Sequence, residues 1–178
     1  MDKDELSALI LGDDPAKVPK WFNLFSDPVW VPKYNTTWTE CRDEPYKKLK
    51  KASESGLFSV KDFFNNPKNI FLAHEFIAQV DGATVIKLTV QYNLFGGSIV
   101  ALHSDRHKYL FDKIDDFSIV GCFCLTELGY GNNAVQMETT VTFDKASDQF
   151  IVNSPTVLSQ KYWITNGFRH SNAALVFG

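Results

Sequence analysis

Apolar residues follow a helical spacing up to Phe117 and a strand spacing after it. In a helix, apolar positions recur three and four residues apart, whereas in a strand they alternate with a period of two. The change of period predicts an α+β fold, with an N-terminal arm and helical domain at residues 1–117 and a β domain at residues 118–178.

The region before residue 33 shows no clear periodicity. Residues 1–20 contain Gly12-Asp13-Asp14-Pro15 and are expected to lack regular structure, because glycine and proline break helices and strands. The residues that follow combine aromatic side chains with prolines, which favours an extended arm laid over an apolar surface. Its aromatic residues are Trp21, Phe22, Phe25 and Trp30.

Local signals then predict a helix that begins after Thr37. Thr37 and Glu40 have the spacing of a capping box, in which each side chain bonds the backbone of the other residue. Gly56 is a natural stop for this helix. Pro45 requires the helix to begin later or to kink, because proline lacks the backbone N–H that a helix interior uses.

Three further segments complete the helical part. Asn66-Pro67 is typical of an N-cap and a first helical residue, and Asp81-Gly82 ends that helix. Its inward face is predicted to hold Ile70, Phe71, His74, Ile77 and Ala78. Segment 83–99 is apolar nearly all round and rich in β-branched residues, so a buried helix and a strand both remain open. A last helix is predicted from Ser104 or Asp105 to Ile114, with Tyr109, Leu110 and Ile114 facing inward.

The β part begins with a strand that is apolar on both faces, as expected where both faces are covered. The strand after it alternates apolar and polar residues, which indicates one exposed face, and it leads through a hairpin loop at residues 144–148. A turn at Asn166-Gly167 separates the last two strands. The predicted strands are 119–125, 137–143, 150–152, 162–164 and 173–177.

Charge and hydropathy exclude several classes of protein. The net charge is −3, with acidic and basic residues interspersed, so no basic surface for nucleic acid is expected. The longest apolar stretch, 85–95, is interrupted by Lys87, Gln91 and Asn93, and is too short and too polar to span a bilayer. The N-terminus, Met-Asp-Lys-Asp-Glu, does not have the basic start and apolar core of a secretory signal.

Cysteine and histidine residues give no evidence for a disulfide framework or a metal site. Cys41, Cys122 and Cys124 are an odd number, and neighbours along one strand make poor disulfide partners. Reduced, buried thiols in an intracellular compartment are the better interpretation. His103 and His107 could share a helical face and bind zinc, but exposed residues of a first helical turn explain them more simply.

Two motifs carry the candidate chemistry. The first is the sequence GCFCLTELGYGNN at residues 121–133, and the second is KYWITNG at residues 161–167. Taken alone, the first motif is consistent with an ordinary turn between strands. The tryptophan of the second motif, taken alone, is consistent with a core residue. Occurring in this order and at this separation, they resemble the flavin-facing strands of the acyl-CoA oxidase and acyl-CoA dehydrogenase family.

This resemblance extends from about Leu94 to Phe177 and implies a fold for the whole chain. The family begins with a helical bundle domain and continues into an antiparallel β-barrel or sandwich domain, so residues 118–178 would be the first part of that domain. A C-terminal four-helix bundle follows in the family and carries the catalytic carboxylate. We therefore expect the chain to hold only the N-terminal portion, to contain no catalytic residue and to have no acyl-CoA turnover by itself.

The resemblance also implies which residues bind FAD. The hydroxyl and backbone groups of Thr126 would meet the pyrimidine edge of the flavin, Trp163 would pack against the ring and Thr165 would lie beside N5. Gly129 and Gly131 would let backbone amides approach a phosphate. The expected cofactor contacts are Leu125, Thr126, Gly129, Gly131, Asn132, Trp163, Ile164 and Thr165, with Asn133 expected at the pantetheine arm of the substrate. In the family Glu127 belongs to the flavin loop, so an acid–base role for it is not expected.

In function, the resemblance implies oxidation of a fatty acyl-CoA to the trans-2-enoyl-CoA. Leu128, segment 94–98 and the long connection before Lys161 are oxidase-like, which favours O₂ as electron acceptor. Thr165 is closer to the dehydrogenase pattern, in which a flavoprotein carrier accepts the electrons, and this alternative stays open. The resemblance further implies a peroxisomal protein that is a homo-oligomer when full-length. The competing hypothesis is a truncated, non-catalytic binding or assembly module.

Overall fold

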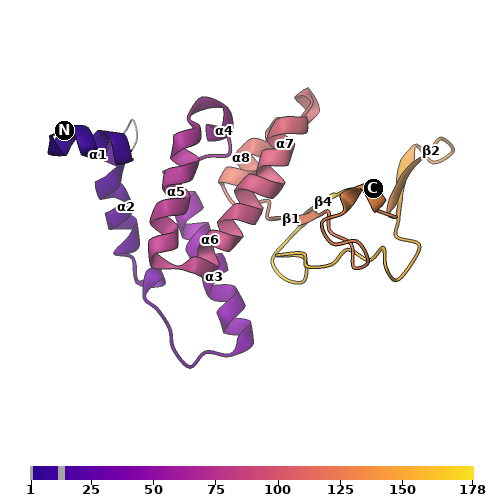
Figure 1. The fold of residues 1–178 in the computed structure, drawn as a ribbon, viewed down its shortest axis with the longest axis horizontal. Helices are drawn as coiled ribbons and strands as arrows, with labels where there is room; N and C mark the ends of the chain where they lie inside the picture. The colour runs from indigo at the N-terminus through magenta and orange to yellow at the C-terminus, as the bar shows by residue number, and fades with distance from the viewer. Residues whose placement is uncertain (1, 12–14) are drawn as a thin grey trace. The chain divides into compact units, whose positions relative to one another are not determined.

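A computed structural model describes residues 2–11 and 15–178 and divides them into two compact units (Figure 1). The first unit is helical and ends at Val120, and the second comprises Gly121–Gly178. Each unit is described by itself. The mixed class of helix and sheet that the spacing of apolar residues predicts is confirmed.

In the helical unit, α6 packs against both α3 and α5. The unit contains α1 (Lys3–Leu11), η1 (Pro15–Lys17), α2 (Val18–Phe25), η2 (Pro28–Trp30), α3 (Trp38–Glu54), α4 (Asp62–Asn65), α5 (Pro67–Val80), α6 (Gly82–Leu88), the π-helix η3 (Thr89–Gly96), α7 (Gly97–Leu102), η4 (Asp105–His107) and α8 (Tyr109–Asp115). Its most deeply buried apolar side chains are Trp21, Leu49, Ala52, Val60, Ala73, Ile77, Leu88, Tyr92 and Ile114.

The expectation of an irregular start and an extended aromatic arm is wrong. Residues 3–11 and 18–25 are helical, and Gly12-Asp13-Asp14 lies outside the described residues. On α2, Trp21 and Leu24 are buried, and Trp21 stacks on Phe58 and Phe76 with ring centroids 5.9 and 5.5 Å away. With eight residues, α2 is too short to show a helical period in the sequence. Its burial in the core therefore decides its conformation.

The capping box at the start of α3 is confirmed. The Glu40 carboxylate accepts from the Thr37 backbone N–H at 2.7 Å, and the Thr37 hydroxyl accepts from the Glu40 N–H at 3.3 Å. The helix nevertheless begins at Trp38 and continues through Pro45, so the prediction of a later start is wrong. Pro45 is buried, and this apolar burial offsets the backbone hydrogen bond that proline cannot make.

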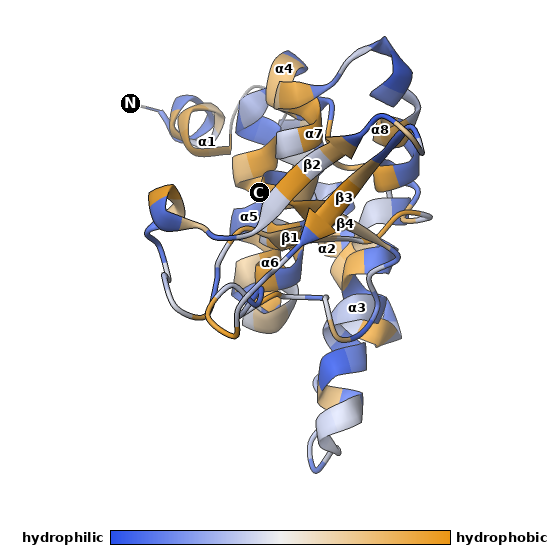
Figure 2. Ribbon diagram, turned by 90° about the vertical axis from the view of Figure 1, so that its right-hand side faces the viewer, coloured by the Kyte–Doolittle hydropathy of each residue, from blue (hydrophilic) through white to orange (hydrophobic). Residues whose placement is uncertain are grey.

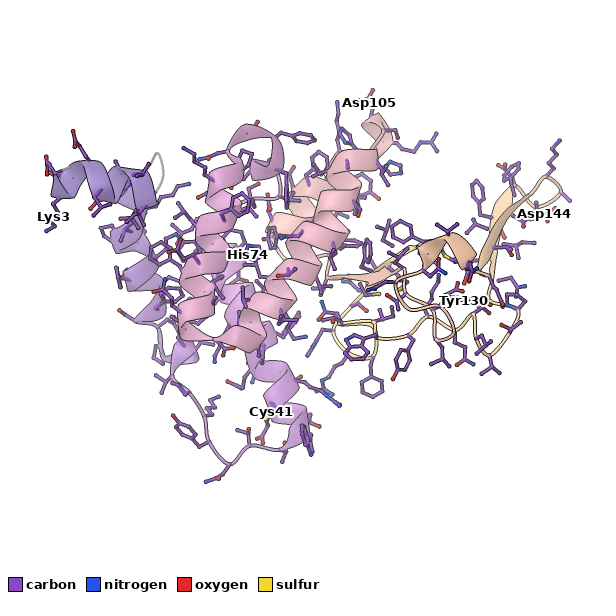
Figure 3. All side chains as sticks on the ribbon, viewed as in Figure 1. Lys3, Cys41, His74, Asp105, Tyr130 and Asp144 are labelled. Carbon is purple, nitrogen blue, oxygen red and sulfur yellow. The ribbon has the colours of Figure 1, made fainter. Side chains whose placement is uncertain are left out.

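The limits of α5 are as predicted, whereas its inward face is partly wrong. Asn66 is the N-cap residue and Pro67 the first helical residue, although the Asn66 side chain makes no capping bond. Phe71 and Ala78 are exposed, and His74 is half-buried, with its ring nitrogens near the Ile70 carbonyl and the Thr89 hydroxyl (Figure 3). The core contacts lie on a face rotated from the predicted one, namely Asn69, Ile70, Leu72, Ala73, Phe76 and Ile77.

Residues 82–102 form one continuous helical segment, in which η3 joins α6 to α7. This resolves the choice between helix and strand for segment 83–99. The helix is long and apolar enough to cross a membrane by length and composition, but one such helix is weak evidence, because a core helix passes the same test. Val90, Gln91, Tyr92 and Phe95 are buried in the helical unit, and the Gln91 amide donates to the Ile119 carbonyl at 2.7 Å.

The last helix is shorter than predicted, and its inward face is partly as predicted, because Ile114 is buried. A 3₁₀ turn, η4, comes first, and α8 begins only at Tyr109. Tyr109 is exposed, so its predicted inward position is wrong, whereas Phe111 and Ile114 are buried. The imidazole of His107 lies 3.2 Å from the backbone nitrogen of Ser104, as in a helix cap. Within the described ranges, 2–11 and 15–178, no cluster of three or more His, Cys, Asp or Glu side chains is placed to hold a metal ion.

The second unit contains two pairs of strands. β1 (Gly121–Cys124) pairs in parallel with β4 (Ala173–Val176), and β2 (Thr140–Asp144) pairs antiparallel with β3 (Gln149–Asn153) in the predicted hairpin. All of β3 is exposed, although Figure 2 colours much of it as hydrophobic. The short helix η5 (Ala134–Gln136) precedes β2.

One predicted strand is absent from this unit. Residues 162–164 form no strand, and Trp163 has a left-handed φ of 63° that breaks extended structure. The thiols of Cys122 and Cys124 are buried and free, as predicted, with their sulfurs 3.6 Å apart. Cys41 is exposed, so the prediction of burial is wrong for this residue.

Candidate functional site

The two motifs meet at one hollow in the second unit. Its volume is about 440 Å³, which is within the range of small-molecule sites. The residues that line it are Thr126, Glu127, Leu128, Gly131, Asn132, Tyr162 and Trp163. Segments that are far apart in the sequence therefore form a single concave surface.

Backbone hydrogen bonds hold the two motifs together at this surface. The Tyr162 N–H donates to the Thr126 carbonyl at 3.0 Å, and the Leu128 N–H donates to the Gln160 carbonyl at 2.9 Å. Glu127 forms a bridge with Lys161 between these two bonds. The contact is a short ladder outside the regular strands, so additional side-chain contacts are needed to hold it.

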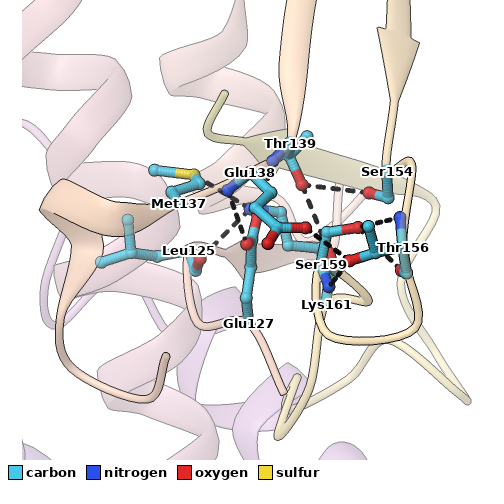
Figure 4. Close-up of polar contacts among 9 residues, drawn as sticks. All are labelled: Leu125, Glu127, Met137, Glu138, Thr139, Ser154, Thr156, Ser159 and Lys161. Carbon is cyan, nitrogen blue, oxygen red and sulfur yellow. Dashed lines mark hydrogen bonds and ion pairs between the residues drawn. The ribbon is translucent and has the colours of Figure 1, made fainter. Parts of the chain in front are cut away.

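A buried ion pair supplies such contacts (Figure 4). The Glu127 residue is 2% exposed, and its carboxylate accepts from the Lys161 ammonium at 3.0 Å. The backbone N–H groups of Glu138 and Thr139 donate to the same carboxylate at 2.9 and 3.0 Å. The charge is thus paired and hydrogen-bonded, as a buried carboxylate requires.

These contacts keep Glu127 ionised. Burial raises the pKa of its carboxyl, but hydrogen bonds from Thr139, Glu138 and Lys161 outweigh that effect and lower the pKa to about 2. A carboxylate with so low a pKa is a weak proton acceptor at neutral pH. The arrangement therefore suits a fixed structural charge.

Further hydroxyl contacts surround the pair. The Glu138 carboxylate accepts from the hydroxyls of Tyr130 and Thr156. The hydroxyl oxygens of Thr139 and Ser154 lie 3.0 Å apart. The hydroxyl of the buried Ser159 donates to the Thr156 carbonyl at 2.8 Å. These bonds link the first motif and the residues just before β2 to the segment that follows β3.

The two glycines of the first motif have different roles. Gly131 has a left-handed φ of 54°, and a side chain there would meet open space, so its backbone conformation requires glycine. Gly129 packs closely, since a Cβ at this position would lie 2.7 Å from the Cβ of Leu158. Only Gly131 therefore fits the predicted role in a tight turn beside a ligand.

The structure brings together part of the predicted cofactor site. Thr126, Gly131, Asn132 and Trp163 line the hollow. The remaining predicted contacts lie outside its lining, and they are Leu125, Gly129, Asn133, Ile164 and Thr165. The ring of Trp163 is 83% exposed, so it is a surface for contact and not a core residue.

Glu127 and Lys161 are important residues whose pairing the sequence did not reveal, and Leu128 and Tyr162 are further lining residues that were not expected. One signal was present, because Glu127 lies three residues after Cys124, the end of a strand apolar on both faces. A carboxylate at such a place is rarely buried without a partner. The identity of that partner could not be read from spacing.

Comparison with known proteins gives a consistent answer. Peroxisomal acyl-coenzyme A oxidase 2 of Arabidopsis thaliana is 38% identical over 126 residues, which are 70% of this chain and 18% of that protein. The crystal structure of acyl-CoA oxidase 1 from Yarrowia lipolytica is 27% identical, covers 97% of this chain and superposes with a TM-score of 0.79. The chain is similar to acyl-CoA oxidases, consistent with an N-terminal portion of such an enzyme.

A further solved structure shares the fold and carries a cofactor. Acyl-CoA oxidase-2 of Caenorhabditis elegans, bound with FAD, ascaroside-CoA and ATP, is 23% identical, covers 92% of this chain and has a TM-score of 0.69. The chain spans about a quarter of the length of the two solved structures, 26% and 25%. No protein-family model matches it. The Arabidopsis thaliana oxidase 2 that the chain resembles is named peroxisomal, which supports the expected peroxisomal localisation by resemblance.

Proposed function

We propose that the chain is the N-terminal part of a FAD-dependent acyl-CoA oxidase. The full enzyme would desaturate fatty acyl-CoA to trans-2-enoyl-CoA and transfer the electrons to O₂, which is the first step of β-oxidation. Residues 1–117 would be its helical domain and residues 118–178 the start of its β domain. Similarity to oxidases over nearly the whole chain supports O₂ as acceptor over a flavoprotein carrier.

The observation that carries this proposal is the meeting of the two motifs at one hollow. The exposed indole ring of Trp163 and the residue Thr126 lie on the same concave surface. A flat aromatic wall and a few polar groups are what an isoalloxazine ring requires, so these residues fit FAD.

Within this site, the chain's own residues would bind and orient. Trp163 would offer a ring face for stacking, and the Thr126 hydroxyl would bond the polar edge of the ligand. Asn132 and the backbone at Gly131 would reach the polar tail, with Asn133 near the substrate arm. When bound, FAD supplies the electron sink for the β-hydrogen of the acyl chain. We assign no catalytic carboxylate to this chain, because Glu127 is held as an anion of low basicity.

A binding or assembly module is the second candidate. One observation favours it: the β2–β3 hairpin exposes large apolar side chains, which are Val141, Phe143, Phe150, Ile151 and Val152. Exposed apolar surface of this kind promotes association with another chain. This candidate predicts that the chain forms assemblies and binds no flavin.

A flavin titration of the purified chain tests the proposal. FAD binding would be followed by quenching of protein fluorescence and by the flavin absorbance band. We expect saturable binding that is weakened about tenfold or more by Trp163→Ala or by Thr126→Val, since each removes a direct contact. Trp38→Ala is the matched control, because Trp38 is 84% exposed but belongs to α3.

The outcomes separate the two candidates. Binding that Trp163→Ala weakens while Trp38→Ala leaves it unchanged supports the flavin site. Equal losses in the two variants, or the absence of binding by a folded chain, would contradict the assignment of the site to these residues.

A further inference from the structure

We infer that Glu127 and Lys161 are positioning residues, whose buried ion pair holds Trp163 in place against the loop of Thr126. This inference rests on the proposed function for its meaning, because it explains how the two walls of the flavin hollow are kept in register. Neither charged group needs to touch the ligand in this role.

Every N–H donor of the Lys161 ammonium has a partner. An ammonium has three such donors. The partners are the Leu125 carbonyl at 3.2 Å, the Glu127 carboxylate at 3.0 Å and the Met137 sulfur at 3.1 Å. Any rotation of the ammonium away from this position would break at least one of these contacts.

Both oxygens of the Glu127 carboxylate also accept hydrogen bonds. One oxygen of Glu127 accepts from the Glu138 N–H, and the other accepts from Thr139 N–H and from Lys161. The pair therefore connects three segments, namely the loop after β1, the segment before β2 and the start of the second motif. Displacement of any one of these segments would break a charge-assisted bond in a buried place.

The backbone of Trp163, which lies two residues after Lys161, is strained. Its φ of 63° is in the left-handed region, which is unfavourable for a bulky residue. Such a conformation persists only where neighbouring contacts impose it. Lys161 fixes the loop on one side of Trp163, and on the other side Asn166 is buried and its amide donates to the Gly121 carbonyl at 3.2 Å. The exposed indole itself supplies little of this restraint.

The ion pair of Glu127 and Lys161 would act on the ligand only by fixing the position of Trp163, because its charged groups do not face the hollow. Glu127 contributes to the lining of the hollow, but its carboxylate is turned into the protein, toward Thr139 and Lys161 (Figure 4). Loss of the charges should therefore free the tryptophan loop without removing a group from the ligand surface. A role in overall stability alone would instead affect the whole second unit equally.

Fluorine NMR of the chain labelled with 5-fluorotryptophan distinguishes these roles. The double variant Glu127→Gln/Lys161→Met removes both charges, so it leaves no unpaired ion in the interior. Trp163→Phe assigns the Trp163 resonance. The exposed pair of Lys50 and Glu54, 3.9 Å apart on α3, provides the control variant Lys50→Met.

In the double variant we expect the Trp163 resonance to shift and broaden as the loop samples several conformations, while the resonances of the buried Trp21 and Trp30 stay unchanged. FAD affinity should fall about tenfold, and Lys50→Met should change neither signal. An unchanged Trp163 resonance in the folded double variant would overturn the inference. Loss of the folded second unit in that variant, seen as the disappearance of its amide dispersion, would also overturn it, because the role would then be general stability.

The NMR signal does not depend on flavin, so the two proposals can fail separately. A mobile Trp163 in the double variant, in a chain that binds no FAD, would support the positioning role and contradict the flavin site. The opposite result would keep the flavin site and refute the positioning role.

Discussion

Asp81 makes a double contribution to the helical unit that can be separated by mutation. One carboxylate oxygen accepts from the Thr84 N–H at 2.9 Å and caps α6, and the other pairs with the Lys48 ammonium of α3. The Lys48 side chain is 7% exposed and that of Asp81 is 16% exposed. Burial raises the pKa of Asp81, but the hydrogen bonds from Lys48 and Thr84 outweigh this effect. The pKa is therefore below its ordinary value, and the residue is an anion at neutral pH.

Two substitutions distinguish these contributions. Asp81→Asn keeps an acceptor for Thr84 but leaves the Lys48 ammonium buried without its counter-charge. Breaking a buried pair costs about 3–5 kcal/mol, and the residual exposure of Asp81 places our estimate at about 3 kcal/mol. Asp81→Ala also removes the cap, which adds about 1 kcal/mol.

Urea unfolding followed by far-ultraviolet circular dichroism measures these losses. Tryptophan fluorescence in a Trp163→Phe background is a second probe of the helical unit, because Trp21, Trp30 and Trp38 all lie there. Asp27→Asn is the control, because Asp27 also caps a short helix and pairs with a lysine, Lys51, but the two side chains are more exposed, at 30% and 47%. This control should change stability little. A loss below about 1 kcal/mol for Asp81→Asn would refute the reasoning, since that is the size of an exposed pair. Equal losses for Asp81→Asn and Asp81→Ala would refute the separate capping contribution.

The remaining predictions concern the second unit. Because folding lowers the pKa of Glu127 from 4.5 to about 2, its contribution to stability is complete above the unfolded value and is lost as the pH falls through the folded one. The acid dependence of unfolding should therefore be shallower in Glu127→Gln between these pH values, and an unchanged slope would contradict the ionised, paired state. Gly129→Ala should cost about 1–3 kcal/mol by crowding Leu158, and Leu158→Gly should relieve it, as measured by thermal unfolding. Leu158→Gly should not rescue Gly131→Ala, whose cost arises from its left-handed φ; rescue of both variants would show that crowding is not the cause.

Much of the local structure could be predicted because its causes lie within a few residues. The capping box of Thr37 and Glu40, the start of α5 at Pro67 and the hairpin loop after Asp144 depend on backbone groups next to the residues that bond them. The two motifs were recognised for a related reason, since each is a continuous run of residues. Meeting at one hollow, they bring together Thr126, Gly131, Asn132 and Trp163, and their role with FAD stays a prediction.

The inward faces of the helices were predicted less well. Phe71 and Tyr109 have the apolar character of core residues but are exposed. A helix shows several apolar stripes when aromatic residues are frequent, and the neighbour that packs against it decides which stripe is buried. In α5 that decision also buries Asn69, whose amide donates to the Leu57 carbonyl at 3.0 Å.

The sequence by itself determined the class of fold, the change from helix to strand after Phe117 and the two motifs of the candidate site, because each is a property of neighbouring residues. Only the tertiary structure decided that Trp21 and Trp30 are buried side chains of short helices and that Glu127 pairs with Lys161. The physical reason is that a short helix or a buried charge is stable only with its partners, and those partners lie far away along the chain.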